Sequence, residues 1–179
     1  SLMQGEAEKY GIVHKEKEPY EVLSTNWLTY GEVLKLKMVE SMVEVYYNSG
    51  QFWHTLEYLV PLEKDAFTFY EKLGSFYEKK GYSDISHSRM RRYEILLEYL
   101  KEETDVPTEV AAQKMLYDLY LREKLKKRPV FAPDQKQYET AVWNYRKNNQ
   151  VSKTAHIEVF ENGTVILFDY EKRDPLSNN

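Results

Sequence analysis

Apolar residues between Tyr30 and Asn48 recur every three or four positions, which predicts one long helix. Two neighbouring rows of apolar residues make a wide face, so we expect this helix to be central to the core. The first row contains Leu34, Met38, Met42 and Val45, and the second contains Leu36, Val39, Val43 and Tyr46.

Both ends of this helix carry local signals. Thr29 is placed as an N-cap, and Glu32 three residues later completes a capping-box pattern. Gly50, after Asn48 and Ser49, is placed as a left-handed residue that ends the helix. The sequence therefore predicts an independent domain that begins at Thr29.

The same helical spacing recurs in four later stretches. Gly74 interrupts one of them, and because glycine is a poor helix former we expect a kink or a close helix contact there. Pro107 suits the first turn of the next helix. The predicted stretches are 51–60, 63–80, from Ser83 or Ser86 to about 103, and 107–127, and a last helix runs from 133 to 148.

After Asn149 the period changes from the helical repeat to an alternation of two, in the segment HIEVFENGTVILFDY. Asn162-Gly163 predicts a type I′ turn, in which both residues have positive φ. That turn pairs Val159 with Ile166 and Ile157 with Phe168. Because an isolated hairpin is marginally stable in water, we expect it to pack on the helices or to extend a sheet elsewhere.

These elements predict a mainly α (α+β) fold, a bundle of about six helices with a C-terminal antiparallel β-hairpin. Residues 1–3 read as a remnant of cloning. Residues 4–28 are expected to form a connecting strap, 29–150 the helical domain, and 151–179 a hairpin and tail packed on the helices.

The amino-acid composition excludes several kinds of chemical site and argues against others. The chain has no cysteine, which excludes disulfides, thiol nucleophiles and cysteine-ligated clusters within it. Its net charge is −4, which argues against nucleic-acid binding, and no apolar run approaches the roughly 20 residues that span a bilayer. No two of its four histidines have metal-pair spacing, and no glycine-rich phosphate loop or nucleophile elbow is present.

Several polar residues have side chains capable of chemistry, but their contexts favour structural roles. His54 is expected to be a packed or surface histidine, and His156 to face Asp169 across the hairpin as a surface pair. The adjacent acids Glu102 and Glu103 read as solvated surface. Basic residues in 121–131 are expected to complement a helix C-terminus, with a docking patch for an acidic partner or RNA as the alternative.

Short motifs in the first third of the chain resemble the segment that follows the barrel in cobalamin-binding radical SAM proteins, of the magnesium-protoporphyrin monomethyl ester cyclase-like group. The resemblance is to their C-terminal domain, which has no assigned function, and it is sharpest over residues 10–52. The motifs are YGI at 10–12, PYEVL at 19–23, NWL at 26–28 and VEVYYNSGQF at 43–52.

The resemblance implies a cytoplasmic bacterial parent, an Fe–S oxidoreductase that uses a 4Fe-4S cluster, S-adenosylmethionine and cobalamin. The strap at 4–28 would then leave the upstream radical SAM barrel. Because this chain has no cysteine, it cannot hold the cluster, and none of the family's catalytic residues maps onto it. We therefore expect no catalytic, cofactor or metal site here, and no activity from this fragment alone.

The resemblance leads to an accessory role, in which the domain covers the barrel or aids selection of substrate or protein partner. The alternative is an independent helical protein-interaction module or, with less support, an RNA-contacting domain; no membrane contact is expected. The sixteen tyrosines are interpreted first as half-buried helix surface, with an aromatic-rich surface docked against another domain as the alternative. The candidate interface residues are Tyr20, Trp27, Tyr46, Tyr47, Asn48, Phe52, Lys126 and Lys127.

Overall fold

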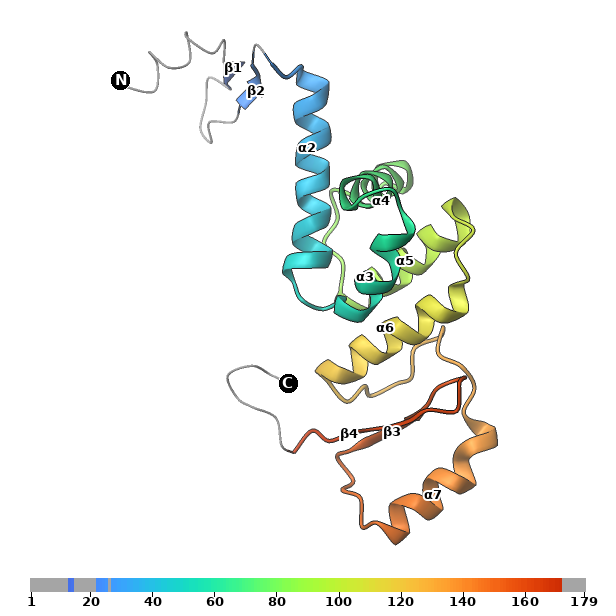
Figure 1. The fold of residues 1–179 in the computed structure, drawn as a ribbon. Helices are drawn as coiled ribbons and strands as arrows, with labels where there is room; N and C mark the ends of the chain where they lie inside the picture. The colour runs from blue at the N-terminus through green and yellow to red at the C-terminus, as the bar shows by residue number, and fades with distance from the viewer. Residues whose placement is uncertain (1–12, 15–21, 26, 172–179) are drawn as a thin grey trace.

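A computed structural model describes residues 13–14, 22–25 and 27–171. Within these ranges the chain forms six α-helices and two short antiparallel ribbons, so the predicted mainly α fold with a C-terminal hairpin is confirmed (Figure 1). The helices are α2 (Tyr30–Met42), α3 (Trp53–Leu59), α4 (Ala66–Lys80), α5 (Arg89–Glu103), α6 (Thr108–Arg122) and α7 (Glu139–Asn148). The strands are β1 (Val13–His14), β2 (Val22–Ser24), β3 (His156–Val159) and β4 (Val165–Phe168), and short 3-10 turns occupy Val60–Leu62 and Lys136–Tyr138.

The predicted capping box at the start of α2 is confirmed. The Thr29 backbone N–H donates to Glu32 Oε2 at 2.7 Å, and the Glu32 N–H donates to Thr29 Oγ1 at 3.3 Å. These bonds satisfy amide groups that have no partner within the helix. The Thr29 backbone N–H and the Thr29 hydroxyl, which also donates to Glu32 Oε2 at 2.8 Å, lower the pKa of the Glu32 carboxyl because they favour its charged form.

The long helix predicted over 30–48 is continuous, but its last turn, Val43–Asn48, is a π-helix. Gly50 follows with φ of 63°, as predicted. The two predicted apolar rows are partly wrong, because Leu34 and Leu36 are 48% and 44% exposed. The N-terminal end of α2 extends beyond α4, its main neighbour, and these two side chains face solvent (Figure 1).

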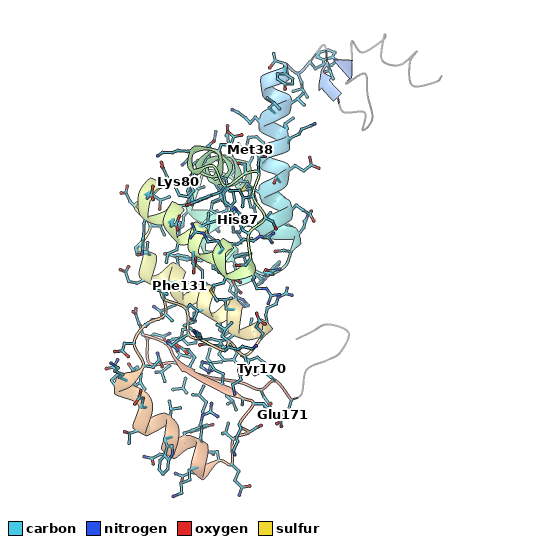
Figure 2. The ribbon with its side chains drawn as sticks, turned by 180° about the vertical axis from the view of Figure 1, so that it is seen from behind. Met38, Lys80, His87, Phe131, Tyr170 and Glu171 are labelled. Carbon is cyan, nitrogen blue, oxygen red and sulfur yellow. The ribbon has the colours of Figure 1, made fainter. Side chains whose placement is uncertain are left out.

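Helices α2 to α6 enclose one aromatic core. Within it the Tyr46 hydroxyl lies 2.7 Å from the Tyr77 hydroxyl and donates to the Arg92 carbonyl at 3.1 Å. The close helix contact expected at Gly74 is confirmed, since Met38 of α2 lies directly against it where the two helices cross (Figure 2). The largest side chains with almost no exposure include Tyr46, Phe52, Phe69, Phe76, Tyr93 and Tyr99.

The hairpin has a different register from the prediction. Val159 pairs with Val165, and His156 pairs with Phe168, one residue away from the expected partners. The turn causes this shift. Gly163 alone has positive φ in it, at 79°, and the Phe160 N–H donates to the Thr164 carbonyl at 2.9 Å. This is a three-residue loop with a bulged glycine, and the predicted type I′ turn is wrong.

The hairpin lies between α6 and α7 (Figure 1). Its inner face forms a small cluster in which Phe168 contacts Leu116 and Tyr120 of α6. Tyr170, just after β4, donates its hydroxyl proton to the Tyr120 carbonyl at 2.7 Å and lies beside the end of α6 (Figure 2). Helix α7 has no buried residue, and its Arg146 donates to the Ser152 and Ala155 carbonyls at 3.2 and 2.8 Å.

The five helices predicted after α2 are all shorter than expected. Helices α3, α5 and α7 begin at Trp53, Arg89 and Glu139, after the predicted starts at 51, 83 or 86, and 133. Helix α6 ends at Arg122, so most of 121–131 is loop and its basic residues lie beyond the helix end. Helix α4 begins only at Ala66, because the Asp65 carboxylate accepts the Thr68 N–H at 2.7 Å and acts as its N-cap. No helix in the described ranges combines the length and hydrophobicity required to cross a bilayer.

Candidate binding site

A groove of about 640 Å³ lies between α6, the start of α3 and the hairpin turn. Helix α6 supplies its floor, because positions 110, 113, 114 and 117 are spaced at i, i+3, i+4 and i+7 and share one helix face. The volume falls in the range of small-molecule sites. The lining residues are His54, Val110, Gln113, Lys114, Tyr117, Phe160, Glu161, Asn162, Thr164 and Ile166.

His54 is held in this groove by Asp118, a carboxylate of α6 that is only 3% exposed. Asp118 Oδ1 lies 2.7 Å from His54 Nδ1 and also accepts the His54 backbone N–H at 3.1 Å. Its Oδ2 accepts the Thr55 N–H at 2.9 Å and the Thr55 hydroxyl at 2.7 Å. Asp118 therefore acts as a cap for α3 from another helix and orients the imidazole at the same time.

The partners of Asp118 decide which ring nitrogen of His54 faces the groove. A carboxylate that receives three other donors accepts from Nδ1 as well, so Nδ1 carries a proton. The opposite nitrogen, Nε2, is left for the groove, because the side chain is 32% exposed. An imidazole oriented in this way can bind a ligand group or take up a proton.

Aromatic rings and one polar bridge form the other walls. The Tyr117 ring lies 4.6 Å from the His54 ring and 6.1 Å from Phe160, in edge-on contacts. Gln113 joins α6 to the hairpin turn: its amide donates to Glu161 Oε2 at 2.8 Å and accepts the Glu161 N–H at 3.2 Å. This bridge holds the turn beside the groove.

Lys114 completes the lining, and within the described part of the chain no carboxylate pairs with it. The groove thus combines an exposed ammonium group, an oriented imidazole and an aromatic floor. No cluster of histidine and acidic side chains in the described ranges could hold a metal ion. The chemistry available from these residues is binding and proton transfer.

A second buried carboxylate lies on strand β3 of the hairpin. Glu158 is 1% exposed and makes two 2.6 Å hydrogen bonds with Arg128. His156 lies 2.9 Å from Glu158 and stacks on Tyr120 at 3.8 Å, so the expected pairing of His156 with Asp169 is wrong. This cluster fixes the hairpin against the loop that follows α6.

The pKa values in this cluster follow from burial and charge. Burial opposes ionisation of Glu158, but the hydrogen bonds from Arg128 and His156 outweigh it, and the pKa of Glu158 lies below its ordinary value. For Tyr120, burial and the nearby Glu158 carboxylate both disfavour the phenolate and raise the pKa to about 12. Glu158 is therefore held as a paired anion.

The candidate interface residues are divided between core and surface. Tyr46 and Phe52 are completely buried, which places them in the core and leaves no surface for a partner to contact. Trp27 and Tyr47 are 83% and 55% exposed. Tyr20 lies outside the described residues.

Asn48 is exposed and donates to Glu44 at 2.6 Å. Tyr47 and the exposed Trp53 line a second, mainly apolar groove of about 580 Å³ between the end of α2 and α3. Tyr47 and Asn48 are therefore accessible on this side of the molecule.

Lys126 and Lys127 are exposed in the loop after α6. Their basic neighbours have partners within the fold: Arg122 donates to the Gly50 carbonyl at 2.8 Å, and Arg128 binds Glu158. Much of the basic run is therefore committed to intramolecular contacts, and little of it remains for a partner.

Sequence reasoning missed Asp118 and the groove. One signal was available, since Asp118 falls between Met115 and Leu119 on the inner face of α6, where an acid requires a partner. No sequence pattern indicates that the partner is His54, which lies 64 positions away.

The fold and the groove define a small helical domain with a candidate ligand site. The model of a family described as a protein of unknown function (DUF4080) matches residues 8–166, so the chain belongs to that family. No curated protein matches the chain, and neither does any solved structure.

Proposed function

We propose that this domain is a non-catalytic accessory domain of a cobalamin-dependent radical SAM enzyme. In this role it lies against the upstream radical SAM barrel of the same chain and covers it, or helps to select a substrate or protein partner. The sequence motifs at 10–52 supply the resemblance. One structural observation supports a docking role, and it concerns α2.

That observation is a row of exposed apolar side chains at the start of α2. Tyr30 and Leu34 are 56% and 48% exposed, and their spacing of four residues puts them on one side of α2. Trp27, just before the N-cap Thr29, is 83% exposed. Large apolar side chains grouped on a surface are typical of an interaction site. The N-terminal end of α2 projects past α4, its main neighbour (Figure 1).

The position of the row favours a partner in the same chain. The β1–β2 ribbon packs beside α2, so the N-terminal part of the chain reaches the domain at this end (Figure 1). A body joined here by a short connection would meet the row at high effective concentration. The 4Fe-4S cluster, S-adenosylmethionine and cobalamin would belong to that body, since the chain lacks cysteine ligands.

The first experiment is to sequence the native gene upstream of Gln4. An in-frame CxxxCxxC motif supports the proposal, and its absence from the complete reading frame overturns the assignment to radical SAM enzymes. With the motif present, S-adenosylmethionine cleavage is compared between the intact parent and a truncation that ends at Leu28. If neither the rate nor the substrate range changes, the domain does not cover or serve the barrel.

A paired variant tests the surface itself in the intact parent. Trp27→Ser with Leu34→Ser should raise amide hydrogen exchange in α2 and mimic the truncation. Trp143→Ser is the matched control, because Trp143 is 60% exposed on α7, distant from α2 (Figure 1). Equal behaviour of the two variants would contradict docking through α2.

A further inference from the structure

We propose that the groove between α6 and the hairpin turn is a binding site for a small aromatic carboxylate. The carboxylate would contact the Lys114 ammonium group, and the planar body would lie on Tyr117 between His54 and Phe160. This inference goes beyond the accessory role, because it concerns another face of the domain and needs no upstream body.

The Lys114 ammonium group favours an anionic group on the ligand. Lys114 is exposed in the groove without a carboxylate partner among the described residues. The acidic residue in the lining, Glu161, is tied to Gln113, because its carboxylate accepts from the Gln113 amide and its backbone N–H donates to Gln113. An ammonium group binds a carboxylate through charge-assisted hydrogen bonds.

The walls favour a flat apolar body. Tyr117 presents a ring to the groove between His54 and Phe160, and Val110 and Ile166 add aliphatic surface. Aromatic rings prefer such offset and edge-on neighbours. An aliphatic dicarboxylate has no ring to pack on the Tyr117 and Phe160 side chains. The aromatic and aliphatic walls of the groove therefore favour an aromatic acid.

The site is also built in advance of binding. Asp118 is buried and holds both the backbone and the ring of His54, so the imidazole does not have to be ordered by the ligand. The Gln113–Glu161 bridge does the same for the hairpin turn. Preorganised groups bind more tightly because less conformational freedom is lost on binding.

The test uses 1-naphthoate as the probe and the neutral 1-naphthalenemethanol as its matched comparison. Binding to the isotopically labelled domain is followed by amide chemical shifts and by calorimetry. We expect saturable naphthoate binding, with shifts in 110–117 and 160–166. Lys114→Met should weaken naphthoate about tenfold or more, since a hydrogen bond to a charged group is lost, and should leave the alcohol unchanged.

Two variants control for fold and for general charge. Lys64→Met removes an exposed lysine outside the groove and should leave naphthoate binding unchanged. Val110→Glu should abolish naphthoate binding while circular dichroism remains that of the parent. The proposal is overturned by naphthoate shifts that map elsewhere, by an equal response to Lys114→Met and Lys64→Met, or by the lack of saturable binding.

Discussion

Replacement of Arg128 by methionine provides a sharp test of how the hairpin is held. The change keeps an unbranched side chain but removes the guanidinium that makes two 2.6 Å hydrogen bonds with Glu158. Glu158 is 1% exposed, so its charge would remain buried with only His156 beside it. Removing one partner of a buried pair costs about 3–5 kcal/mol, and we expect a loss near the lower figure because the Arg128 side chain is 31% exposed.

The effect has a predicted pH dependence. In the parent chain the pKa of Glu158 lies below 4.5, so the pair stabilises the fold above that pH and the stabilisation is lost as pH falls through the folded pKa. Without Arg128, burial should raise the pKa of Glu158 above 4.5. The variant then loses stability as pH rises through that raised value, so the difference between the two proteins should be largest at pH 7 and should narrow towards pH 4.5.

The assay is urea unfolding by circular dichroism at several pH values, with hydrogen exchange of residues 156–168. Lys127→Met is the matched control, an exposed neighbour whose loss should change the free energy of unfolding by less than about 0.5 kcal/mol. Glu158→Gln in the Arg128→Met background should restore part of the loss. A loss below about 1 kcal/mol at pH 7 would refute the argument that the pair anchors the hairpin.

Three further changes test other contacts by urea unfolding. In Gly74→Ala the new Cβ would lie 2.6 Å from Met38 Cγ, so we expect the free energy of unfolding to fall by about 1–3 kcal/mol. Gly31→Ala, where a new Cβ would meet nothing within 4 Å, should be neutral or stabilising. Equal effects of the two changes would contradict the close contact at Gly74. Asp118→Ala removes the acceptor of four hydrogen bonds and should cost about 3 kcal/mol, and a stable variant with unchanged α3 hydrogen exchange would contradict its capping role. Gly163→Ala should cost about 1 kcal/mol, because φ is 79° there, and no loss would argue against the bulged turn.

Local signals in the sequence were reliable where the structure is local. The Thr29–Glu32 capping box and the left-handed glycine at 50 depend on contacts within a few residues, and both were predicted correctly. The close contact at Gly74 was also indicated, since glycine within an apolar helix pattern requires a reason. That Met38 supplies the reason was not readable from the pattern.

Predictions that depended on which neighbour lies opposite were less successful. Leu34 has the spacing of a core residue, but α2 extends past its neighbours, and the side chain is 48% exposed. The Asn162-Gly163 pair predicted a two-residue turn, whereas the hairpin is built around a three-residue loop. The resulting shift by one residue placed His156 opposite Phe168, beside Glu158 and Tyr120.

By itself the sequence determined the helical class, the starts of α2 and (within one residue) α6, and the existence of the hairpin, because hydrophobic period, capping and turn residues act over short distances. The tertiary structure alone decided that Asp118 binds His54 and that Arg128 binds Glu158. These pairs join residues 64 and 30 positions apart, and their partners are selected by burial, which obliges a carboxylate to find donors wherever the fold brings them. The groove beside His54 is also decided by the tertiary structure, because it forms where three separate segments of the chain meet.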